Sequence, residues 1–131
     1  MILLDTDIAS LFYAGHIQVT ERITKSDPTE TVGTTIITEA EMLRARYEFL
    51  LKASDGQQLQ RAQEQLERTR EFLDDLVVVR VEVASAREFD RLRQDKKLKG
   101  IGRADLLIGC IALAHRATLV TRNVRHFKEN P

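Results

Sequence analysis

Residues 1–16, MILLDTDIASLFYAGH, combine a short apolar run with the start of a helix. The run at residues 1–4 is typical of a buried strand, and the segment that follows is typical of a helix that Gly15 ends. Two carboxylates, Asp5 and Asp7, come directly after the strand. A buried carboxylate is costly unless another group compensates for it. Other parts of the sequence must therefore supply groups that converge on this point.

Strand and helix patterns alternate along the remaining chain. Further strands, rich in Val, Ile and Thr, are predicted at residues 31–38, 77–81 and 118–121. Helices are predicted at residues 17–26, 38–54, 57–76, 82–100 and 102–116. The alternation predicts an α/β fold with a short, mostly parallel central sheet flanked by helices. We expect one domain over residues 1–131, with a helical hairpin inserted at about residues 38–76.

The composition narrows the class of protein. Lys+Arg and Asp+Glu each number 20, so any contact with nucleic acid must come from local basic patches rather than from net charge. The single cysteine, Cys110, lies in an apolar run and is expected to be buried without a disulfide. The N-terminus lacks the pattern of a signal peptide, and no apolar run is long enough to cross a membrane. These features predict a cytoplasmic protein.

Further acids occupy positions comparable to those of the first two. Glu41 lies in the first turn of the helix predicted from Thr38, and Asp105 lies in the first turn of the last predicted helix. Each has a local explanation. Thr38 and Glu41 fit a capping box, and Asp105 suits the positive end of the helix dipole. Asp7 fits a helix cap, whereas Asp5 has no evident capping role.

Taken together, the acids predict a metal site. Ligand sites in parallel sheets lie beyond the carboxyl ends of the strands, which is where these acids are expected. Carboxylates gathered there raise one another's pKa values, and a hard divalent cation relieves that repulsion. The sequence has no HExxH motif, no Cys/His cluster and no Ser-His-Asp spacing that would indicate different chemistry. A Mg²⁺ or Mn²⁺ site that acts on phosphate esters is therefore predicted.

Three blocks of the sequence resemble the PIN-domain nucleases, in particular the VapC-type toxins of bacterial toxin–antitoxin pairs. The blocks are ILLDTD at residues 2–7, TTIITEAEML at residues 34–43 and IGRADLLIGCIALAHRATLVTRNVRHF at residues 101–127. The last block is the most specific, and together they extend over the whole chain. The resemblance implies a three-layer PIN-like domain.

The resemblance also implies a set of site residues. Asp5, Glu41 and Asp105 would hold Mg²⁺ or Mn²⁺ and, with Asn123, form the catalytic site. Supporting side chains are expected at Thr6, Asp7, Thr38 and Thr121. Many family members carry Asp at the position of Asn123 and a further acid at that of His126, so this departure bears on the occupancy of a second metal ion.

The implied reaction is metal-dependent hydrolysis of RNA phosphodiester bonds by the toxin of a VapBC-like pair. Basic residues expected to contact RNA are Lys97, Lys99, Arg103, Arg122 and Arg125. Members of the family are typically dimeric and are neutralised by a small antitoxin. The expected partners are therefore RNA, a cognate antitoxin and a second copy of the chain.

Two alternatives remain open at this point. LLDTDIAS is close to the start of haloacid-dehalogenase-type phosphatases, in which Asp5 would be the nucleophile and Asp7 the acid/base. Ala9 stands where that motif has Thr or Val, which weighs against it. The second alternative is a PIN-like RNA- or protein-binding module whose catalysis is weakened by Asn123 and His126.

Overall fold

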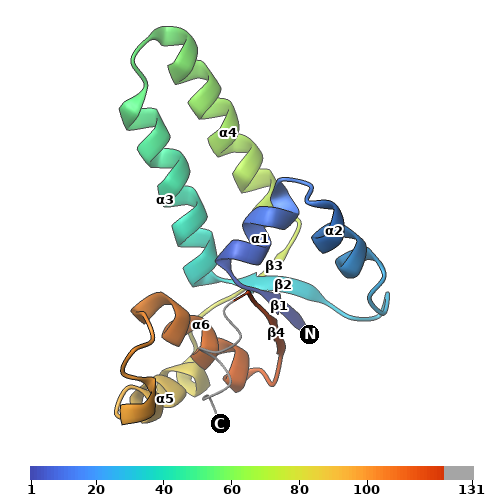
Figure 1. Cartoon of the computed structure of the whole chain (residues 1–131), viewed down its shortest axis with the longest axis vertical. Helices are drawn as coiled ribbons and strands as arrows, with labels where there is room; N and C mark the ends of the chain where they lie inside the picture. Colours follow the sequence, from blue (N-terminus) through green and yellow to red (C-terminus); the bar gives the residue numbers. More distant parts are fainter. Residues whose placement is uncertain (123–131) are drawn as a thin grey trace.

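The computed structural model describes residues 1–122 (Figure 1). The strands are β1 (Ile2–Leu4), β2 (Val32–Thr35), β3 (Val77–Val79) and β4 (Thr118–Val120). The helices are α1 (Thr6–Tyr13), α2 (Ile17–Thr24), α3 (Ile36–Lys52), α4 (Gly56–Asp74), α5 (Val83–Leu92) and α6 (Arg103–Ala114), with a short 3-10 helix η1 (Lys96–Leu98) before α6. The predicted α/β fold with a parallel central sheet is confirmed.

The sheet has the strand order β3-β2-β1-β4, and every pairing is parallel. β1 therefore lies in the middle, between β2 and β4. Its register places Leu4 opposite Thr34 on one side and opposite Val120 on the other. The carboxyl ends of these strands consequently lie at the same level, and the residues that follow them share one edge of the sheet.

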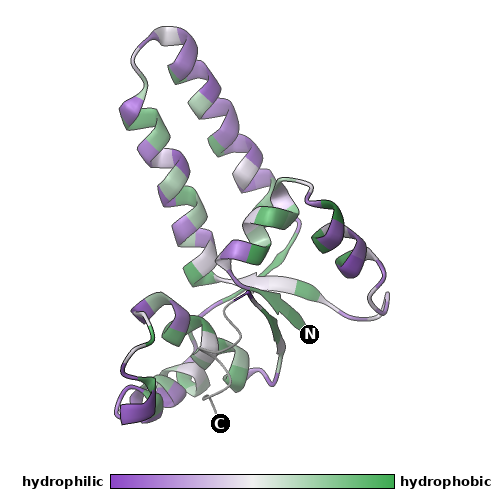
Figure 2. Cartoon of the chain, viewed as in Figure 1, coloured by the Kyte–Doolittle hydropathy of each residue, from purple (hydrophilic) through white to green (hydrophobic). Residues whose placement is uncertain are grey.

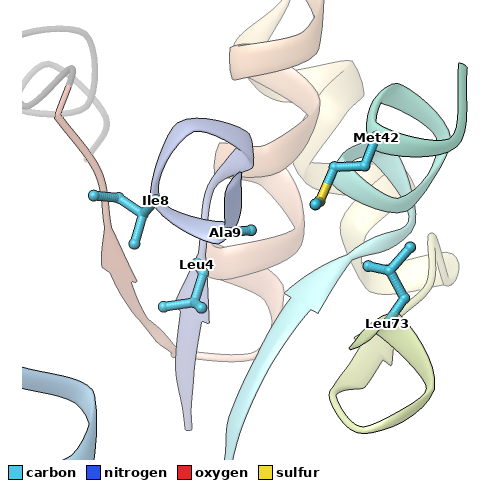
Figure 3. Close-up of a cluster of buried hydrophobic side chains, with 5 residues drawn as sticks. All are labelled: Leu4, Ile8, Ala9, Met42 and Leu73. Carbon is cyan, nitrogen blue, oxygen red and sulfur yellow. The ribbon is translucent and has the colours of Figure 1, made fainter. Parts of the chain in front are cut away.

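The sheet is covered on both faces because successive residues of a strand point to opposite sides. Leu4 packs in one cluster with Ile8, Ala9, Met42 and Leu73, which come from α1, α3 and α4 (Figure 3). The preceding residue, Leu3, belongs to a second cluster on the other face. Its buried partners there are Val79 of β3 and Ile111 and Ala112 of α6. Helix, sheet and helix thus form three layers.

Helices α3 and α4 form a hairpin that projects away from the sheet (Figure 1). Hydrophilic residues predominate along α4 and alternate with hydrophobic ones along α3, whereas β1 and β4 are largely hydrophobic (Figure 2). Its base is fixed to the core by the buried side chains of Met42 and Leu73. The outer part of the hairpin presents many polar groups to solvent, and it also exposes the large side chains of Tyr47, Phe49, Leu51 and Leu59.

Two predicted boundaries are wrong. α3 begins at Ile36 rather than at Thr38, because Thr35 ends its strand and caps the helix by accepting the Thr38 amide at 3.3 Å. The helix predicted at residues 82–100 ends at Leu92, and η1 follows with Asp95 as its cap. Polar cap side chains compete with continued strand or helix geometry at both places.

The prediction for the single cysteine is confirmed. Cys110 is buried, at 1% exposure, and carries a free thiol. Burial raises the pKa of that thiol to about 11, which is typical of an inert packing cysteine. Among the helices within residues 1–122, none combines the length and the apolar character that crossing a membrane requires.

Candidate active site

Asp5 is the buried centre of the site, with 2% of its surface exposed. It caps α1, since its Oδ1 accepts the Ile8 amide at 2.9 Å. Its Oδ2 accepts the hydroxyl of Thr121 at 2.5 Å. The prediction that Asp7 caps this helix and that Asp5 has no capping role is therefore wrong. Asp7 lies exposed in the first turn of α1.

Some of the groups around Asp5 raise the pKa of its carboxyl, and others lower it. Burial raises the pKa of the Asp5 carboxyl, and the negative charges of Asp7 and Asp105 raise it further. The hydrogen bonds from Thr121 and from the Ile8 amide lower it, but the net change is an increase. The ionised carboxylate is thus held at a site that disfavours its charge. A nearby positive charge would relieve this cost.

Glu41 is connected to the same edge through a threonine. It lies exposed in the second turn of α3, and its Oε1 accepts the Thr6 hydroxyl at 2.7 Å. The capping-box interpretation of Thr38 and Glu41 is wrong, since Thr35 is the cap and the Glu41 side chain turns instead to the start of α1. The hydrogen bond joins the first residue of α1, which follows β1, to the second turn of α3, the helix that follows β2.

A second hydroxyl lies behind this contact. Thr38, fully buried, lies with its Oγ1 3.0 Å from the Oγ1 of Thr6. A hydroxyl has one proton to donate, and Thr6 gives its proton to Glu41. Thr38 must then donate to Thr6, so the two threonines form a chain that ends at the Glu41 carboxylate. This chain restricts the orientation of Glu41.

Asp105 approaches from the opposite layer. It lies half-buried in the first turn of α6, where the helix dipole favours a carboxylate. It is close enough to Asp5 to raise the pKa of that residue. Asp105 of α6 therefore lies near Asp5 at the start of α1, and Glu41 of α3 is connected to Thr6, the residue after Asp5.

Asp5, Glu41 and Asp105 offer only carboxylate oxygens, which are the ligands that a hard divalent cation prefers. The Asp5 carboxyl is also buried and has a raised pKa. Within residues 1–122, however, no group of three His, Cys, Asp or Glu side chains is arranged closely enough to hold a metal ion. The Oε1 atom of Glu41 accepts the Thr6 hydroxyl, and a carboxylate has further lone pairs with which it could hold a cation.

The predicted RNA-contacting cations lie in two places. Lys97 and Lys99 are exposed on or beside η1, and Arg103 at the start of α6 stacks over the Phe89 ring at 5.2 Å. These three precede Asp105 along the chain. Arg122 instead lines a cavity of about 500 Å³ with residues of α1 and α2. Arg125, and the catalytic candidate Asn123, lie outside the described residues.

The sequence interpretation missed two threonines next to the site. Thr34 donates its hydroxyl to the Leu4 carbonyl at 2.6 Å, which ties the end of β2 to the end of β1. Thr35 caps α3 and thereby sets the position of Glu41 on that helix. The Thr-Thr pair at the end of an apolar strand pattern was an available signal for such a cap.

These features can be compared with known proteins. The sequence matches the PIN domain family over residues 2–131. The chain belongs to the PIN domain family. The three-layer fold and the family resemblance are thereby confirmed, and the haloacid-dehalogenase alternative is wrong. No curated protein sequence matches the chain.

Solved structures with the same fold include toxin–antitoxin proteins. VapBC2 from Rickettsia felis, bound to a DNA fragment from its promoter, is 26% identical with a TM-score of 0.77, over 100% of this PIN domain and 94% of that chain. VapBC-1 from nontypeable Haemophilus influenzae is 23% identical with a TM-score of 0.78, over 98% of this PIN domain and 91% of that chain. VapBC-5 from Mycobacterium tuberculosis, a member of the VapBC family of toxin-antitoxin systems, is 27% identical with a TM-score of 0.56. The match covers 92% of this PIN domain and 83% of that chain.

Proposed function

We propose that this PIN domain is a metal-dependent ribonuclease and the toxin of a VapBC-like toxin–antitoxin pair. The observation that supports this best is the set of acids at one edge of the sheet. Asp5 lies buried with its pKa raised in part by Asp105, and Glu41 is joined to the residue next to Asp5 through the Thr6 hydroxyl. Similar structures are those of VapBC proteins.

Asp5, Glu41 and Asp105 would hold Mg²⁺ or Mn²⁺. When bound, the ion supplies Lewis acidity that activates a water molecule and neutralises negative charge on the phosphate. The protein's own groups prepare this site. Thr121 orients Asp5 and favours its ionised form, and Thr6 fixes the orientation of Glu41. Asp7 or Asn123 would orient the attacking water.

The exposed basic residues that precede Asp105 in the sequence would bind the RNA backbone. Lys97, Lys99 and Arg103 can neutralise phosphates that flank the cleaved bond. The guanidinium of Arg103 is kept near the start of α6 by its contact with Phe89. Arg122, which lines the cavity beside α1 and α2, would contact the RNA at a second place. Arg125, outside the described residues, is also proposed to contact RNA.

The test is cleavage of single-stranded RNA by the purified protein with Mn²⁺ or Mg²⁺. The wild type should cleave, EDTA should stop the reaction, and Asp5→Asn should abolish it. Asp90→Asn is the matched control, because this exposed carboxylate on α5 lies outside the acidic site. Cleavage that survives Asp5→Asn would contradict the assignment. Metal binding without cleavage would favour the weakened binding module.

The toxin role has its own test. The proposal includes a small cognate antitoxin, which the family resemblance and the similar VapBC structures support, and a homodimer, which the family resemblance alone implies. Expression of the protein alone should arrest bacterial growth, and co-expression with the product of an adjacent short reading frame should restore it. Light scattering of the purified protein measures its oligomeric state. Growth unaffected by an active wild-type enzyme would contradict the toxin role while leaving the nuclease intact.

A further inference from the structure

The hairpin of α3 and α4 contains a groove that the acidic site does not use. The groove has a volume of about 520 Å³ and is lined on both helices. Its lining consists of two alanines, Ala53 and Ala62, and six larger residues: Arg46, Phe49, Lys52, Gln58, Arg61 and Gln65. Among the described residues that line it, none is acidic. The groove is therefore suited to a polyanion.

An aromatic ring in the groove is held in place by an arginine. The guanidinium of Arg46 lies over the rings of Tyr13 and Phe49, at 5.4 and 5.8 Å from their centroids. Its Nε also donates to the Thr69 hydroxyl at 3.1 Å. Phe49 is nevertheless 55% exposed. The ring is thus fixed by Arg46 and still available for stacking.

Lys52 and Arg61 provide the remaining positive charge. Both are exposed, and neither forms an ion pair within residues 1–122. Lys52 follows Glu41 by close to three helical turns, so the two side chains start from the same side of α3, about 16 Å apart along its axis. A strand of a few nucleotides bound at Glu41 can therefore extend to this groove.

The apolar surface of α3 lies elsewhere. Tyr47 and Leu51 are 56% and 68% exposed, and each is two residues from Phe49. That spacing places them roughly 160° around the helix from Phe49. Among the side chains that line the groove, Phe49 is the single large apolar one, so the lining lacks the continuous apolar strip on which an amphipathic peptide helix docks. Cations beside an exposed ring are instead the features that bind single-stranded nucleic acid.

We infer that this groove binds single-stranded RNA, with phosphates at Lys52 and Arg61 and a base stacked on Phe49. The inference rests on the proposed ribonuclease function and extends it to the recognition of RNA that flanks the cleaved bond. The groove residues contribute to affinity and to the choice of substrate, while the acids perform the chemistry.

Fluorescence anisotropy of a labelled single-stranded RNA of mixed sequence tests the inference. The full-length protein is used in EDTA, so binding is measured without cleavage. Phe49→Ala and the double variant Lys52→Gln/Arg61→Gln should each bind roughly tenfold or more weakly than wild type. Phe49→Trp should restore binding, because it keeps a stacking surface.

Matched controls lie outside the groove. Tyr47→Ala removes an exposed ring from the other side of α3, and Lys25→Gln/Arg70→Gln removes two exposed charges elsewhere. Neither should change RNA affinity beyond twofold. Equal affinities for groove variants and controls overturn the inference. It is also overturned if groove variants bind RNA normally but lose binding to the antitoxin, which would make the groove a peptide site.

Kinetics with Mn²⁺ separate this inference from the proposed function. If both hold, the groove variants show a raised KM and an unchanged kcat on a long RNA. If wild-type protein binds RNA through the groove but cleaves none, the nuclease proposal is contradicted and the inference that the groove binds RNA is supported. If wild type cleaves RNA with the same KM as the groove variants, RNA binding by the groove is contradicted and the nuclease proposal is supported.

Discussion

Thr121 donates its hydroxyl to Oδ2 of Asp5 at 2.5 Å, although the two residues lie 116 positions apart in the chain. The contact follows from the sheet register, in which the residues preceding them, Leu4 and Val120, are paired. A buried carboxylate is thereby given a donor that favours its ionised form. The pairing of β1 with β4 is therefore part of the site as well as of the fold.

Thr121→Val should impair the enzyme without unfolding it. Loss of the hydroxyl raises the pKa of Asp5 further, because that hydrogen bond lowers it in the wild type. Metal-dependent cleavage should fall by roughly 10- to 100-fold, as is usual for a partner that orients a metal ligand. The acid limb of the pH profile of kcat/KM should move to higher pH. Thr118→Val, an exposed position on the same strand, should leave both unchanged. A fall in rate with an unmoved acid limb would contradict the assigned role.

Asp5→Asn should raise stability at neutral pH in EDTA. The folded protein raises the pKa of this carboxyl above its unfolded value, so the associated stability is present at low pH and is lost as pH rises through the folded pKa. The amide keeps an acceptor for the Ile8 amide and removes the buried charge. Thermal melts should show a higher Tm than wild type at neutral pH and an equal Tm at about pH 3.

The same melts test for metal binding. Added Mn²⁺ should raise the Tm of the wild type, because a ligand that binds only the folded state stabilises it, and should have little effect on Asp5→Asn. Asp90→Asn, an exposed carboxylate, should behave as wild type under both conditions. A lower Tm for Asp5→Asn at neutral pH in EDTA would show that the hydrogen bonds of Asp5 outweigh its burial.

Thr6→Val should reduce cleavage more than Thr38→Val does. Thr6 contacts Glu41 directly, whereas Thr38 acts through Thr6. We expect roughly a 10- to 100-fold loss for Thr6→Val and a smaller loss for Thr38→Val. Thr6→Ser keeps the donor and should retain most activity, measured as kcat/KM on RNA. Full activity of Thr6→Val, which keeps the methyl group and lacks the hydroxyl, would show that the hydroxyl is not required.

Gly33→Ala should destabilise the sheet. A Cβ at this position in β2 would overlap the Val77 carbonyl of β3, so the two strands would have to separate. Overpacking of this kind costs about 1 to 3 kcal/mol in the free energy of unfolding. Urea titration followed by circular dichroism measures the loss. At Gly100, a Cβ would meet no atom within 4 Å among the described residues, so Gly100→Ala should change stability little.

The sequence by itself determined the type and order of most elements, and it supplied the acids that are proposed for the site. The apolar runs MILL and VVV contain β1 and β3, Asp5 directly follows β1, and Asp105 lies in the first turn of α6, as local patterns predict. Glu41 lies one turn further into its helix than the pattern predicts, because α3 begins at Ile36. Such patterns depend on neighbouring residues, so they can be identified without knowing the fold.

Only the tertiary structure decided which group each acid contacts. Asp5 rather than Asp7 caps α1, Glu41 bonds to Thr6 rather than to its own helix start, and Thr121 reaches Asp5. These choices depend on the register of β1 between β2 and β4, which joins residues from distant parts of the chain. Local spacing cannot specify that register, because the pairing of strands is set by how both faces of the whole sheet are packed.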